Sequence, residues 1–159
     1  MPKLLKFFLL LALFSLPLFW LWMEWGQAAY QKLIGAAIVP LVQALGEKSL
    51  NLFVLKAHYM NVVPLTALIL AAPALGWKKR LAALALGLVI LYVWHLLFSL
   101  VLNHYQTLWG PDRRFYRVFI PAISVNSALP VILWFMLARK GVKELMGEIF
   151  ARPEEPQRG

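Results

Sequence analysis

The side chain in this sequence with the clearest capacity for chemistry is a histidine inside an apolar segment. His95 lies within the run 81–102, which contains no Asp, Glu, Lys or Arg. An imidazole in such surroundings can carry a proton, bind a metal ion or a small molecule, or bond to a neighbouring helix. We expect the last of these, with a neutral ring bonded to Ser124, Asn126 or Ser127.

A second set of polar side chains lies between the apolar runs. Tyr59 and Asn61 precede one run, and the connection 103–117 is rich in polar and charged residues. Its arginines could bind a carboxylate or a lipid phosphate through paired N–H donors, but such a cluster is also typical of a surface that faces lipid headgroups. The candidate binding residues are Tyr59, Asn61, His95, His104, Asp112, Arg113, Arg114, Arg117 and Asn126.

These residues form no recognisable catalytic pattern. The sequence contains no cysteine, which excludes a thiol nucleophile and a Cys-ligated metal centre. The motifs G-x-S-x-G and H-E-x-x-H are absent, and the three histidines lie 37 and 9 positions apart, which matches no metal-ligand motif. We therefore predict no catalytic residue, no metal and no cofactor.

The composition indicates which elements must hold these side chains. Of the 159 residues, 62% are hydrophobic and 14% charged, and the mean hydropathy is +0.70. Soluble domains have roughly 45–50% apolar and about 25% charged residues, so this chain is expected to be an integral membrane protein. The net charge of +9 comes from residues between apolar runs, which favours membrane lipids as partners and argues against nucleic acid.

The apolar runs predict an all-α fold, a four-crossing transmembrane helical bundle over residues 1–141. A helix needs roughly 20 apolar residues to span about 30 Å of hydrocarbon. The predicted crossings are 4–23, 60–77, 81–102 and 118–137.

Two further segments have helical periodicity. Residues 28–45 place apolar side chains at i, i+3, i+4 and i+7, which predicts an amphipathic helix at the outer interface, with a fifth crossing as the alternative. Residues 142–159 are expected to form a short cytoplasmic amphipathic helix followed by a disordered tail.

The distribution of Lys and Arg predicts the orientation. With four crossings, ten of these residues lie on the side of both termini and six on the opposite side. Cytoplasmic loops carry the excess of positive charge, so we expect both termini to be cytoplasmic in a bacterial inner membrane.

The order of features also suggests a family. An amphipathic stretch ends near Gly46, a polar segment enters the helix 61–77, and a basic turn at 76–81 leads into the helix 84–102, which contains Gly87. Over residues 28–140 this order resembles the core of the exosortase and archaeosortase membrane transpeptidases.

The family's active positions are not retained. The resemblance places its nucleophilic Cys near Tyr59, Met60 and Asn61, its Asn-x-x-Arg motif near 95–98 without the arginine, and its last histidine near Asn126 or Ser127. Without a thiolate no acyl-enzyme can form there. The resemblance therefore implies a non-catalytic relative, comparable to the exosortase H-associated membrane protein.

The sequence thus predicts an accessory or assembly protein bound to a larger membrane protein. The alternative is an intramembrane enzyme, or a binder of small molecules or lipids, with an outer-facing pocket around His95 and the loop 103–117. A transporter or channel is the weakest hypothesis, because no predicted crossing contains an ion-coupling charge in its interior.

Overall fold

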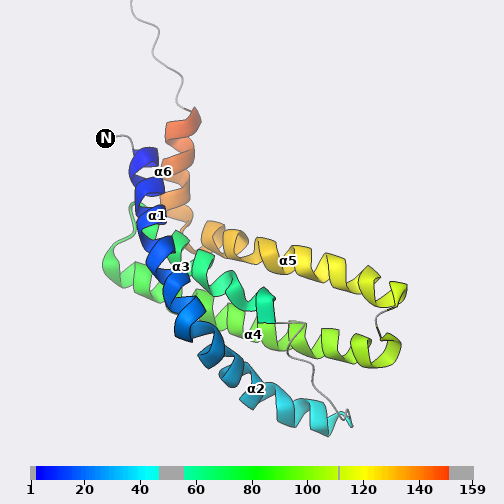
Figure 1. Cartoon of the computed structure of the whole chain (residues 1–159). Coiled ribbons are helices and arrows are strands. Elements are labelled where there is room, and N and C mark those ends of the chain that lie inside the picture. The colour runs from blue at the N-terminus through cyan, green and yellow to red at the C-terminus, as the bar shows by residue number, and fades with distance from the viewer. Residues whose placement is uncertain (1–2, 47–55, 111, 151–159) are drawn as a thin grey trace, which may run out of the picture.

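The computed structural model describes residues 3–46, 56–110 and 112–150, and those ranges form helices joined by short turns (Figure 1). The predicted all-helical class is therefore confirmed. The elements are α1 (Lys3–Leu21), a π-helical segment (Trp22–Gly26), α2 (Gln27–Ala44), a 3₁₀ segment (Lys56–Asn61), α3 (Val62–Ala71), α4 (Trp77–Trp109), α5 (Arg113–Leu137) and α6 (Arg139–Phe150).

Within the described residues, three helices are long and apolar enough to cross a membrane. They are the continuous helix Lys3–Ala44 with 42 residues, α4 with 33 and α5 with 25. At 1.5 Å per residue even α5 is about 37 Å long, which exceeds the roughly 30 Å of bilayer hydrocarbon. The lengths and compositions agree with the membrane protein that the sequence predicts.

The N-terminal helix differs from the prediction, which separated a crossing over 4–23 from an amphipathic helix over 28–45. The structure joins them, because the backbone N–H of Gln27 bonds to the carbonyl of Trp22, five residues earlier. This wide turn lets the helix continue where the sequence becomes polar, and the chain bends there (Figure 1). Trp22 turns inward and is buried.

The helix predicted over 60–77 is shorter in the structure. α3 ends at Ala71, and Trp77 is already the first residue of α4. The cause is Pro73, which disfavours the helical conformation at the preceding residue, and Ala72 is accordingly extended, with ψ 124°. The apolar helix Tyr59–Ala71 is therefore too short to span the hydrocarbon alone.

α3 lies at the centre of the structure and packs against α1, α4 and α5. Its buried side chains contribute to an apolar cluster that includes Leu91 of α4 and Leu133 of α5. Gly87 permits this close packing, because an added Cβ would lie 3.1 Å from Leu65 and 3.2 Å from Leu137. α4 and α5 run antiparallel beside each other (Figure 1).

The start of α1, the turn between α3 and α4, and α6 lie together at one end of the molecule. The Lys3 ammonium is 3.3 Å from the Glu144 carboxylate, and a Cβ added at Gly141 would overlap the carbonyl oxygen of Pro73. We call this the basic end, comprising residues 3–10, 71–80 and 137–148. The turn between α4 and α5 lies at the far end (Figure 1).

Candidate functional site

His95 lies in the interior of the helix bundle. Its side chain is fully buried, and its Nδ1 atom is 2.8 Å from the hydroxyl oxygen of Tyr30 on α2. The side chain of Asn126, one of the partners expected from the sequence, also interacts with the ring. Within the described residues Nε2 lacks a partner with full hydrogen-bond geometry. The histidine thus links α4 to α2.

The ring of Tyr59 packs beside His95, with 5.1 Å between ring centroids. The hydroxyl of Tyr59 is 2.7 Å from the hydroxyl of Ser99, one helical turn after His95. Both side chains are fully buried. This hydrogen bond ties the 3₁₀ segment before α3 to α4.

Asn126 connects three elements through two different atoms. Its side-chain Oδ1 accepts a hydrogen bond of 2.9 Å from the indole N–H of Trp94, and its backbone carbonyl accepts one of 2.5 Å from the amide of Asn61. That carbonyl needs an outside donor, because Pro130, four residues later, has no N–H to offer it. Asn61 therefore supplies the hydrogen-bond donor that Pro130 cannot supply within α5.

These groups form one buried and half-buried set, which we call the polar core: Tyr30, Tyr59, Asn61, Trp94, His95, Ser99 and Asn126. It contains no carboxylate and no Lys or Arg. Hydrogen bonds between such groups hold helices together in lipid, where water cannot replace a lost partner. The arrangement is suited to fixing the positions of α2, α4, α5 and the segment before α3.

The structure brings together four of the nine predicted site residues, namely Tyr59, Asn61, His95 and Asn126. The other five lie outside the polar core. His104 is exposed, nine residues and about 14 Å further along α4. Asp112 caps α5 by accepting a hydrogen bond from the N–H of Arg113. The side chains of Arg113, Arg114 and Arg117 are exposed on the first turns of α5.

Three members of the polar core were not predicted: Tyr30, Trp94 and Ser99. The spacing offered a signal for Ser99, because it follows His95 by four residues and so shares its helix face. Tyr30 belongs to the apolar stripe of the segment 28–45, and the sequence does not show which helix that stripe meets.

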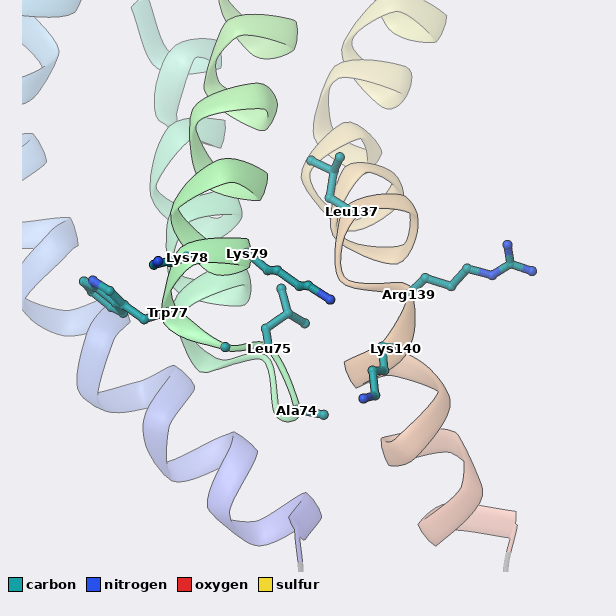
Figure 2. A pocket seen from close by; sticks show the side chains of 9 residues that line it. Ala74, Leu75, Trp77, Lys78, Lys79, Leu137, Arg139 and Lys140 are labelled. Carbon is teal, nitrogen blue, oxygen red and sulfur yellow. The ribbon is translucent and has the colours of Figure 1, made fainter.

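Two pockets lie at the basic end, and neither is lined by residues of the polar core. The larger, of about 560 Å³, lies between the start of α4 and the junction of α5 with α6 (Figure 2). The smaller, of about 380 Å³, includes Lys3, Lys6, Arg80 and Glu144. Arg80 donates a hydrogen bond of 2.7 Å to the carbonyl of Ala72 and so closes the end of α3.

No group of three His, Asp or Glu side chains suited to a metal ion occurs within residues 3–46, 56–110 and 112–150. Comparison of the chain with protein-family models, curated proteins and solved structures found no match.

Proposed function

We propose that this chain is a non-catalytic, multi-pass protein of the bacterial inner membrane that helps a larger membrane protein to assemble. In this proposal the partner belongs to an exosortase-type protein-sorting system. The helix α3 enters the bilayer from the far end and completes a fourth, partial pass enclosed by α1, α4 and α5. Both termini are then cytoplasmic, because the basic end carries the excess of Lys and Arg.

The observation that carries the proposal is the poor coverage of the N-terminal helix. Only 6% of the most apolar window of Lys3–Ala44 is buried, compared with 28% for α4 and 22% for α5. Its uncovered side chains include large aromatic residues, which are enriched where proteins bind one another. Such residues on this helix are Phe8, Phe19, Trp20 and Trp25. One face of this helix packs against α3, and the face that carries these aromatic side chains is available to a partner in the membrane.

The polar core supports a structural role for the buried polar side chains. Tyr59 and Ser99 bond to each other, and the side-chain Oδ1 and the backbone carbonyl of Asn126 both accept hydrogen bonds from neighbouring elements. Groups used in this way stabilise the arrangement of the helices and are not free to meet a substrate.

Photocrosslinking in native membranes tests the proposal. p-Benzoylphenylalanine is introduced at Phe8 or Phe19 in the full-length chain, and matched controls carry it at Ile120 or Met136, which are similarly exposed on α5. We expect the positions on α1 to give one heavier protein adduct and the positions on α5 to give lipid adducts. Mass spectrometry of the heavier adduct should identify an exosortase-type protein.

Two results would contradict the proposal. Lipid adducts alone at both positions of α1 would show that no protein covers this helix. The same heavier protein adduct at the positions on α1 and on α5 would show that contact with the partner is not specific to the N-terminal helix.

A further inference from the structure

The larger pocket at the basic end combines positive charge with an apolar lining. Four of its side chains are cations, Lys78, Lys79, Arg139 and Lys140, and its lining contains no carboxylate. The apolar part comes from Leu75, Trp77 and Leu137. This combination suits a molecule that has both an anionic group and a hydrocarbon part.

Two of the cations approach the pocket from opposite walls. Lys79 extends from the start of α4 toward the junction of α5 with α6, and Lys140 extends from α6 toward Ala74 (Figure 2). Lys78 and Arg139 point outward and add charge at the rim (Figure 2). Neither Lys79 nor Lys140 forms an ion pair within the part of the chain that the structure describes.

The backbone adds to the positive potential. The N-cap of α4 is Gly76, which is extended and has no side chain to bond the first N–H groups of the helix. These free N–H groups and the helix dipole favour an anion at this position.

The pocket lies where two apolar helices end. Lys78 and Lys79, followed by Arg80, lie just before the uncharged run 81–102, and Arg139 and Lys140 lie just after the uncharged run 118–137. Because α4 and α5 are antiparallel, both clusters reach the membrane interface on the same side (Figure 1). A lipid in the adjacent leaflet therefore has its phosphate at the level of the cations and its acyl chains at the level of Leu137.

We propose that this pocket binds an anionic phospholipid. The lipid phosphate lies between the ammonium groups of Lys79 and Lys140, and the start of an acyl chain packs on Leu75 and Leu137. Basic pockets between transmembrane helices are suited to such headgroups. Free phosphate would use the cations alone and would gain nothing from the apolar lining.

Lipid binding to the purified full-length protein in neutral detergent tests this site. Native mass spectrometry measures the affinity for phosphatidylglycerol and for phosphatidylcholine with the same acyl chains. The variant Lys79→Gln/Lys140→Gln removes two cations from the pocket. The control Arg113→Gln/Arg114→Gln removes two exposed cations from the far end.

We expect the wild type to prefer phosphatidylglycerol. The pocket variant should lose about 30-fold in affinity for it, at about 1 kcal/mol for each cation. The control variant and Lys79→Arg/Lys140→Arg should change by less than about threefold.

Three results would overturn the assignment. An equal loss of affinity for phosphatidylglycerol in the pocket variant and the control variant would show that only the total charge of the protein attracts the lipid. Equal wild-type binding of phosphatidylglycerol and phosphatidylcholine would show no selection for an anion, and this result does not depend on the folding of any variant. Inorganic phosphate that displaces phosphatidylglycerol at equal concentration would show that the apolar lining contributes nothing.

Discussion

Ser99→Ala is expected to destabilise the protein more than Tyr59→Phe, although the two substitutions remove opposite ends of one hydrogen bond. The hydroxyl groups lie 2.7 Å apart and both side chains are fully buried. After Tyr59→Phe, the hydroxyl of Ser99 can rotate and donate to the carbonyl of His95, one turn earlier in α4. After Ser99→Ala, the phenol of Tyr59 has lost the partner that the structure gives it.

The difference should be measurable. A buried hydroxyl left without a partner costs about 1–3 kcal/mol, and interhelical hydrogen bonds in membranes contribute about 0.6–1.7 kcal/mol. We therefore expect Ser99→Ala to lower the free energy of unfolding by about 1–2 kcal/mol and Tyr59→Phe by about 0.5 kcal/mol or less. The double variant should be more stable than Ser99→Ala alone, because it leaves no buried hydroxyl without a hydrogen-bond partner.

The free energy of unfolding can be measured by titrating the protein in mixed micelles with SDS and following helicity by circular dichroism. A larger loss for Tyr59→Phe than for Ser99→Ala would refute the reasoning. A double variant destabilised by the full sum of the single effects would also refute it, because additive losses would mean that the two hydroxyls do not share one bond.

Two further substitutions test other parts of the structure. Gly141→Ala should destabilise the protein by about 1–3 kcal/mol, because the added Cβ would overlap the carbonyl of Pro73. The matched control is Gly147→Ala in the same helix, where the added Cβ meets nothing within 4 Å. This substitution should stabilise the protein by about 0.5–1 kcal/mol. Equal effects of the two substitutions in SDS titration would argue against contact between α6 and the turn before α4. Asp112→Ala should cost about 1 kcal/mol, because α5 loses the carboxylate that caps Arg113, whereas Asp112→Asn should preserve stability; an equal loss in both would argue against the cap.

The sequence predicted which segments are helical better than where those helices end. Hydropathy marked 81–102, but α4 extends from Trp77 to Trp109, because its ends are set by the extended Gly76 and by Gly110 at φ 60°. Hydropathy measures preference for lipid, and a helix that leaves the hydrocarbon remains a helix until the backbone conformation changes. The break at Pro73 follows from the backbone restriction that a proline places on the residue before it, which hydropathy does not register.

The sequence predicted more of the residues of the polar core than of the hydrogen bonds between them. Asn126 precedes Pro130 by four residues, so its carbonyl has no donor within α5. The donor is Asn61, and the partner of His95 is Tyr30; each pair is 65 positions apart in the chain. Which faces of distant helices meet depends on helix rotation and tilt, which a single sequence does not encode in its local pattern.

The most direct test of the proposed membrane arrangement is to determine on which side of the membrane each end of α4 lies. The chain has no cysteine, so single cysteines can be introduced at Lys78, Arg139 or Arg114 and labelled in intact cells with a membrane-impermeant maleimide. α4 is about 50 Å long, so its two ends must lie on opposite sides of the hydrocarbon if it crosses upright. We predict that the cysteines at 78 and 139 are protected together while the cysteine at 114 is labelled. Labelling of positions 78 and 114 from the same side would contradict the account.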